Sequence, residues 1–207
     1  MGFEITTSLY EKPDRSFYEC DNVVKVARDL IGMLLVSKIN GVLTAGRIVE
    51  TEAYCGRGDK ACHANNKRTP RTETMYGKGG RAYIYLCYGI HHMFNVVTNV
   101  EGKADAVLIR ALEPIVGLEE MKLRRNNRGK LASGPGTLTQ AMGIKTSMDN
   151  IDLLGETIWI AKNPSEEKIN LVADRRVGVD YAEEDALKPW RFLLQGSSFV
   201  SKPPFSK

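Results

Sequence analysis

The spacing of apolar and polar residues predicts a helix followed by a strand near the start of the chain. Residues 22–31 (NVVKVARDLI) repeat apolar side chains at helical spacing, with Asp21 expected as the N-cap and Gly32 as the residue that ends the helix. Residues 33–39 are mostly apolar, as expected for a strand.

The next strand carries the most unusual polar pattern of the chain. The Asn-Gly pair at 40–41 is a strong hairpin signal, so residues 42–54 are expected to return beside the preceding strand. Within this run Glu50, Glu52 and Tyr54 lie two residues apart and would share one side of a strand. Two carboxylates on one surface repel each other, which calls for nearby cations. The pattern suits either chemistry or the polar face of an exposed edge strand.

The middle of the chain combines a long irregular segment with further strands. Residues 55–81 are rich in glycine and charge, and loops of this length in compact domains are usually functional or disordered. Residues 82–99 form two strand-like runs on either side of an expected turn near Gly89, and residues 106–114 form another strand.

Proline positions mark the predicted elements of the second half. Pro114 is expected to open a helix that runs to residue 125. A polar break follows at 126–136, and Pro135 near its end is expected to open a short helix that ends near Gly143. Late strands are expected at 157–161 and 190–196.

Composition and length are those of one folded domain. The chain has 207 residues, of which 43% are hydrophobic and 26% charged, and the net charge is only +4. We find no internal repeat and no linker, so residues 1–207 are expected to form a single domain. Residues 1–15 and 201–207 are expected to be frayed ends.

Cysteine usage and hydropathy bear on the compartment. The chain has four cysteines without a C-x-x-C pair, which favours a reducing environment over a disulfide scaffold. No stretch reaches the apolar length of a membrane span, and the first residues lack the hydrophobic core of a signal peptide. The sequence therefore predicts a cytoplasmic protein, associated with the nucleoid if the source is prokaryotic, and no contact with a membrane.

Several common site types lack their sequence signatures. The pairs at 62–63 (Cys-His) and 91–92 (His-His) are adjacent, and adjacent strand residues point to opposite faces, so neither chelates a metal easily. The usual zinc spacings, a P-loop, a dinucleotide fingerprint and a nucleophile elbow are all missing. No metal and no cofactor are predicted.

Basic and aromatic residues together suggest contact with a nucleotide. Positive side chains gather in the irregular segments, at Lys67, Arg68, Arg71, Lys122, Arg124, Arg125, Arg128 and Lys130. Such runs are often solvated surface, but the following SGPG at 133–136 adds backbone N–H groups at an expected helix start, where phosphate binds well. Tyr83, Tyr85 and Tyr88 lie near the expected hairpin tip and suit either core packing or base stacking.

Seven motifs, in order along the chain, carry a resemblance to a known family. They are GRIVETEAY at 46–54, DKACH at 59–63, YIYLCYGIHHMFN at 83–95, VLIRALEP at 107–114, SGPG at 133–136, RRVGVDYA at 175–182 and KPWRF at 188–192. From about residue 20 to residue 200 the chain resembles the monofunctional alkyladenine (3-methyladenine, or methylpurine) DNA glycosylases.

The resemblance implies a fold and an activity. The expected fold is α+β, a mixed α/β single domain with a curved antiparallel sheet flanked by helices and a protruding β-hairpin that enters the DNA minor groove. The expected activity is base-excision repair. A monomer would flip an alkylated or deaminated purine out of double-stranded DNA and hydrolyse its N-glycosidic bond with carboxylate-activated water, leaving an abasic site without lyase cleavage.

The resemblance also assigns roles to individual residues. Glu52 matches the catalytic carboxylate and Arg110 the arginine that helps to hold the attacking water. Tyr54 and Tyr85 match the tyrosines that sandwich the flipped base. A backbone carbonyl within 177–179 is expected near the water.

The remaining matched positions belong to the pocket and the hairpin. His63 lines the base pocket, and Asn95 is associated with discrimination against the exocyclic amino group of guanine. Tyr88 matches the residue that fills the gap in the duplex. Glu50 is expected to pair with a cation or to support the strand. Ile90 and His91 depart from the better-known mammalian members beside Tyr88.

Two alternatives stay open at this point. A nucleic-acid-binding module could keep the fold without chemistry, although the presence of both Glu52 and Arg110 speaks against it. A metal-dependent nuclease would need divalent ions.

Overall fold

The fold is built around one eight-stranded sheet in which all the strand pairs are antiparallel. The computed structural model describes residues 11–164 and 169–205. The strands are β1 (Leu34–Ile39), β2 (Val42–Tyr54), β3 (Ala82–Cys87), β4 (His91–Thr98), β5 (Asp105–Val116), β6 (Ile158–Ala161), β7 (Leu171–Asp174) and β8 (Arg191–Leu194). Their main order is β3-β4-β5-β2-β1-β6, and β8 pairs with both β2 and β7.

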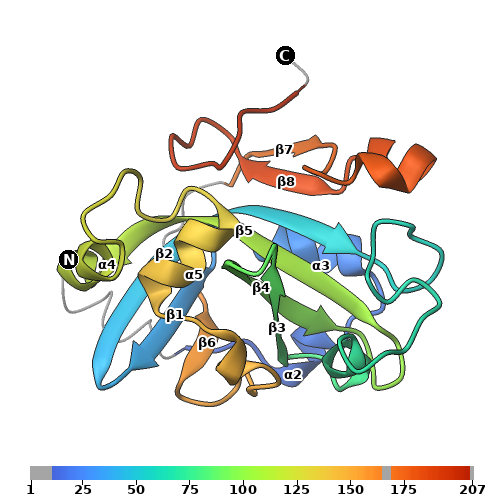
Figure 1. The fold of residues 1–207 in the computed structure, drawn as a ribbon, viewed down its shortest axis with the longest axis horizontal. Coiled ribbons are helices and arrows are strands. Elements are labelled where there is room, and N and C mark those ends of the chain that lie inside the picture. Colours follow the sequence, from blue (N-terminus) through green and yellow to red (C-terminus); the bar gives the residue numbers. More distant parts are fainter. Residues whose placement is uncertain (1–10, 165–168, 206–207) are drawn as a thin grey trace.

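Short helices flank this sheet (Figure 1). The α-helices are α2 (Arg15–Tyr18), α3 (Val23–Asp29), α4 (Leu118–Arg124) and α5 (Pro135–Met142), and the 3₁₀ segments are η1 (Glu73–Tyr76), η2 (Thr146–Met148) and η3 (Asp180–Leu187). The curved antiparallel sheet with few helices confirms the α+β fold expected from the sequence. No helix in residues 11–164 or 169–205 has the length and apolar character needed to cross a membrane.

The long strand β2 organises the sheet. Its first half pairs with β1 and its last residues pair with β8 on the same edge, while β5 runs along the opposite edge. β2 is buried over most of its length, because neighbours cover it on both edges. The exposed edge strand that the sequence left open is therefore excluded, and the carboxylates of β2 lie inside the protein.

The pairing of β2 with β5 is irregular where the carboxylates lie. Ile48 is opposite Leu112 and Glu50 is opposite Ala111, so Val49 has no counterpart in the register. The next pair is Thr51 with Ile109, which leaves Arg110 as an extra residue on β5. Bulges of this kind re-aim side chains.

Helix α3 packs on the sheet through its apolar face. Val23, Val26 and Ala27 are buried, and the Thr51 hydroxyl donates a 2.8 Å hydrogen bond to the carbonyl of Ala27. The N-cap is Asn22, whose side chain accepts from the backbone N–H of Lys25 at 3.0 Å. The prediction of Asp21 as N-cap was wrong by one residue, because Asn22 supplies the same type of capping oxygen.

The two helices assigned from proline have different outcomes. Pro135 opens α5 as predicted, and Gly143 follows it with a left-handed φ of 71°. Pro114 does not open a helix: it lies in β5 opposite Gly46, and α4 begins at Leu118. β4 pairs with β5 only over residues 105–108, so the missing N–H of Pro114 costs no hydrogen bond with β4.

The residues described near both ends of the chain make specific contacts. The carbonyl of Glu11 accepts from the backbone N–H of Lys162, and Arg15 pairs with Asp152 at 2.6 Å. The backbone N–H of Ser201 donates to Glu50 at 2.6 Å. Residues 11–15 and 201–205, which were expected to fray, are therefore attached to the body of the protein. Residues 1–10 and 206–207 lie outside the described residues.

The irregular segment 55–81 is held against the start of β5. The backbone N–H of Gly56 donates to Asp105 at 3.0 Å, and Arg57 pairs with the same carboxylate at 2.7 Å. A Cβ added to Gly56 would lie 2.4 Å from the carbonyl oxygen of Ala104. Only glycine allows this close approach of two backbone segments.

We predict that Gly56→Ala lowers the free energy of unfolding by about 1–3 kcal/mol, because the added methyl group forces the two segments apart. Denaturant unfolding measures the loss. Gly77→Ala is the matched control, since its added Cβ would meet the nearest atom at 3.3 Å. Equal losses in both variants would contradict this account.

Candidate active site

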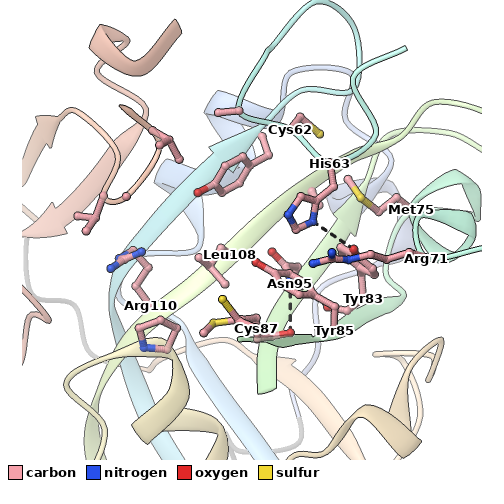
Figure 2. A pocket seen from close by; sticks show the side chains of 18 of the residues that line it. Cys62, His63, Arg71, Met75, Tyr83, Tyr85, Cys87, Asn95, Leu108 and Arg110 are labelled. Atoms are coloured by element: carbon pink, nitrogen blue, oxygen red, sulfur yellow. Dashed lines mark hydrogen bonds between the residues drawn. The ribbon is translucent and has the colours of Figure 1, made fainter. Parts of the chain in front are cut away.

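A cavity of about 520 Å³ opens on one face of the sheet (Figure 2). Its wall combines strand residues with residues from the segment 55–81 and from the segment before η3. The residues of this wall include Tyr54, His63, Arg71, Tyr85, Asn95 and Arg110. Figure 2 shows His63, Tyr85 and Asn95 gathered on one side of the pocket and Arg110 on the other.

Strand alternation separates the cavity from the hydrophobic core. On β5, Leu108 and Arg110 line the cavity, whereas Val107 and Ile109 belong to the main core cluster. The same alternation holds on β3 and β4, where Tyr83, Tyr85, Met93 and Asn95 line the cavity and Ile84, Phe94 and Val96 are core residues. One face of the sheet therefore stabilises the fold and the other presents polar and aromatic groups.

Glu52 lies immediately behind the cavity wall and has no exposed surface. One carboxylate oxygen accepts from the Tyr54 hydroxyl at 2.7 Å and from Arg110 Nη1 at 3.1 Å. The other oxygen accepts from the backbone N–H of Val177 at 2.7 Å. Tyr54, Arg110 and Val177 all line the cavity, so the carboxylate is held at its boundary.

Arg110 bridges the two glutamates of β2. Its Nε donates to Glu50 at 3.1 Å while its Nη1 donates to Glu52 at the same distance. Its exposed fraction is 7%. The bulge at Arg110 gives the guanidinium this position between residues 50 and 52, and burial strengthens both ion pairs.

Glu50 belongs to a second group of buried charges. It also pairs with Arg191 at 3.2 Å, and Arg191 in turn pairs with Asp174 at 3.3 Å. The expectation that Glu50 pairs with a cation is confirmed, and the cations are two arginines. Three carboxylates thus share two guanidinium groups across this network, which leaves one formal negative charge.

Aromatic rings form the opposite wall of the cavity. The ring centroids of Tyr83 and Tyr85 are 5.3 Å apart, and the edge of His63 approaches Tyr85 with a centroid distance of 4.7 Å. Tyr54 has the guanidinium of Arg176 over its ring at 4.9 Å. Burial raises the pKa of Tyr83 to about 12 and also raises the pKa of Tyr54 well above its ordinary value, so both phenols stay neutral.

His63 is a titratable group of the cavity whose pKa is lowered. The surrounding protein removes water from the imidazole, and the positive charge of Arg71 disfavours a second charge on the ring, so the pKa of His63 falls to about 4 although the residue is exposed on one side. Its Nδ1 lies 3.3 Å from the Tyr83 hydroxyl. His63 is therefore neutral at physiological pH.

Asn95 is fixed at the base of the cavity. Its side-chain nitrogen donates to the carbonyls of Tyr83 at 3.0 Å and Met93 at 3.4 Å. With the amide nitrogen engaged, the side-chain oxygen is the group left for a ligand in the cavity.

Tyr88 lies at the tip of the hairpin formed by β3 and β4. Its exposed fraction is 92% and that of Ile90 is 71%, whereas Asn95 and Arg110 deeper in the cavity are only 4% and 7% exposed. Tyr88 has a left-handed φ of 51° and Gly89 one of 73°, which turn the chain between the strands. The turn predicted near Gly89 is confirmed, and it presents an aromatic side chain to solvent.

The comparison with known proteins agrees with this geometry. Residues 16–198 match the family model described as methylpurine-DNA glycosylase (MPG). The chain belongs to this family.

Relatives support the family assignment over nearly their whole length. The chain is 46% identical over 196 residues to a protein of Natranaerobius thermophilus, covering 92% of this chain and 98% of that protein. It is also 46% identical to proteins of Bacillus cereus strain Q1 and Desulfitobacterium hafniense, covering 90% of this chain and 97% of each. All three carry the name "Putative 3-methyladenine DNA glycosylase".

The methylpurine-DNA glycosylase fold brings the predicted site residues to one place. Tyr54, His63, Tyr85, Tyr88, Asn95 and Arg110 all line the cavity, and Glu52 lies directly behind Tyr54 and Arg110. From residues 177–179, the group that contacts Glu52 is the backbone N–H of Val177.

Sequence reasoning missed two arginines that shape the site. Arg176 pairs with the buried Asp59 at 2.6 Å and packs over Tyr54. Arg191 holds Glu50, as described above. Both lie within motifs that resembled the family, but the sequence offered no signal for their pairing with Asp59 and Glu50, which are more than a hundred residues away.

The predicted basic runs are largely engaged within the protein. Arg68 pairs with Glu73, Lys122 with Glu119 and Arg124 with Glu120. Arg71 differs, because its guanidinium lies over the ring of Tyr85 at 4.9 Å on the cavity wall. No group of three or more His, Cys, Asp or Glu residues that could hold a metal ion occurs in the described part of the chain.

We predict that His63 loses its proton at about pH 4 and that Arg71→Gln raises this pKa, since one of the two causes of the shift is removed. NMR titration of the imidazole measures both values. Because the unfolded chain binds this proton near pH 6.5, the His63 contribution to stability decreases as the pH falls from 6.5 to 4. An unchanged His63 pKa in the Arg71 variant would contradict the assignment.

Proposed function

We propose that this protein is a monofunctional 3-methyladenine DNA glycosylase that removes alkylated or deaminated purines from double-stranded DNA. The observation that carries the proposal is the position of Glu52, a buried carboxylate held by Tyr54, Arg110 and Val177 at the boundary of an aromatic cavity. The names of its relatives point to the same activity.

The cavity suits a flipped purine. Tyr54 and Tyr85 would stack on the base, and a positively charged 3-methyladenine is attracted to aromatic faces. The target bond is inaccessible inside a duplex, so the nucleotide must leave the stack. Asn95, whose side chain is held by two backbone carbonyls, would exclude guanine by steric contact with its exocyclic amino group. Neutral His63 would contact the base edge.

The proposed reaction is hydrolysis of the N-glycosidic bond. For a positively charged alkylated purine, the bond electrons leave with the base, which becomes neutral, and the sugar becomes a cation resembling an oxocarbenium ion. Water then adds to C1′ and gives a proton to Glu52, which completes the abasic site. The formal negative charge of the Glu50–Glu52–Asp174 network supports a cationic sugar at this position.

Water must reach Glu52 through the cavity wall. Glu52 has no exposed surface in this structure, and Tyr54 and Arg110 separate it from the cavity. We infer that the bound nucleotide displaces the Tyr54 hydroxyl enough for one water molecule to lie between Glu52 and Arg110. The guanidinium of Arg110 then holds the water oxygen while Glu52 accepts the proton.

The hairpin would act on the duplex. Tyr88 would occupy the space that the flipped nucleotide leaves, because it is the most exposed large aromatic residue in the described part of the chain and it lies at a narrow tip. Strand cleavage is not part of the proposal, since a lyase needs an amine nucleophile and the site centres on a carboxylate. The product strand should stay intact until alkali is added.

We predict that Glu52→Gln lowers single-turnover base release by at least about 10²-fold, because the variant loses both the base and the negative charge. Release of 3-methyladenine from a duplex carrying one lesion measures the rate. Binding to that duplex should be retained.

Glu113→Gln is the matched control for this test. Glu113 also lies in the sheet and pairs with an arginine, Arg47, but it does not line the cavity. Glu50→Gln is not a neutral control, since Glu50 contacts Arg110 directly. A fully active Glu52 variant would move the catalytic assignment elsewhere.

We predict that Tyr88→Ala weakens binding to a lesion-bearing duplex by about 1–3 kcal/mol, the range of base–aromatic stacking. The loss should be much smaller on single-stranded DNA, which has no stack to fill. Titration of both labelled DNAs measures the difference, and equal losses would argue against insertion.

A further inference from the structure

The last described residues of the chain lie against the buried charges of β2. We call residues 197–205 the C-terminal strap; they follow β8 and appear in red in Figure 1. The backbone N–H of Ser201 donates to one oxygen of Glu50 at 2.6 Å, and the Ser201 hydroxyl donates to the other at 2.9 Å. One residue of the strap therefore contacts both oxygens of a fully buried carboxylate.

Ser201 also contacts Arg110. The Arg110 Nη2 lies 3.4 Å from the Ser201 hydroxyl oxygen, which accepts from it while its own hydrogen points to Glu50. Each of the three guanidinium nitrogens thus has one partner: Glu50, Glu52 or Ser201. Glu52 alone would leave the guanidinium free to rotate, and the other two contacts fix its plane.

The strap is anchored on both sides of Ser201. Arg191 donates to the carbonyls of Lys202 at 3.4 Å and Pro203 at 3.2 Å. The ring of Phe205 lies against the guanidinium of Arg175 at 4.2 Å. On the other side Lys130 donates to the carbonyl of Ser198 at 3.3 Å. These contacts hold Ser201 in position, and they explain how the C-terminal strap is fixed although it has no regular secondary structure.

We propose that Ser201 is a positioning residue for the glycosylase reaction, acting through Glu50 and Arg110 to hold the arginine beside Glu52. The proposal rests on the proposed function, in which Arg110 holds the attacking water. Ser201 lies beyond residues 16–198, the part of the chain that matches the family model. Its role comes from the contacts of the strap and not from the matched motifs.

The test compares four full-length proteins: the parent, Ser201→Ala, Ser201→Thr and Ser198→Ala. Ser201→Ala removes the hydroxyl that links Arg110 to Glu50, and we expect single-turnover base release to fall about tenfold with lesion-duplex binding unchanged. Ser201→Thr keeps the hydroxyl and should restore the rate. Ser198→Ala should match the parent, because within residues 11–164 and 169–205 the Ser198 hydroxyl makes no hydrogen bond.

A second measurement does not depend on activity. The Nε–H resonance of Arg110 in the NMR spectrum of the free protein should shift, and its hydrogen should exchange faster with water, in Ser201→Ala but not in Ser198→Ala. If the parent is active, the positioning role is overturned by either of two results: an unchanged Arg110 resonance in Ser201→Ala, or a rate of base release in Ser201→Ala equal to that of the parent. A parent that releases no base while the resonance shifts overturns the proposed function and leaves the contact supported.

Discussion

The ion pairs of Arg110 with Glu50 and Glu52 are the interaction on which the rest of this structure depends. Charges without exposed surface are costly unless each has partners, and removing one partner leaves an uncompensated charge in the interior. β2 supplies the two glutamates, β5 supplies Arg110, β8 supplies Arg191 and the C-terminal strap supplies Ser201, so these segments must assemble together. The proposed chemistry uses the same ion pairs, which makes folding and activity difficult to separate at this point.

One face of the sheet packs in the hydrophobic core, and the other face lines the cavity. Apolar residues of β3, β4 and β5 alternate with cavity residues, so the core can be continuous beneath a wall that is polar and aromatic. The bulge at Arg110 is the departure from this regularity, and it lies where the two glutamates need a shared cation. A regular register would have paired Arg110 with a residue of β2 instead of leaving it between Glu50 and Glu52.

Exposure divides the proposed DNA contacts from the proposed catalytic groups. Tyr88 lies in solvent at a turn with left-handed backbone, a conformation that tyrosine adopts at some cost, whereas Glu52 is fully enclosed. Core packing does not explain an aromatic residue at this turn, because Tyr88 lies in solvent. Insertion into the DNA duplex would explain it. The cavity lies between these extremes, with one aromatic wall open to a ligand and a charged boundary closed to bulk water.

The sequence by itself determined every described strand except β7, the hairpin at residues 82–99, the helix at Pro135 and the shared face of Glu50, Glu52 and Tyr54, because these follow from local periodicity and turn chemistry. The motifs also carried the family resemblance. Only the tertiary structure decided that β2 is interior, that Pro114 continues a strand and that Arg110 is bulged. It also decided the partners of Glu50, since Arg191 and Ser201 lie more than a hundred residues further along the chain and no local pattern encodes such a contact.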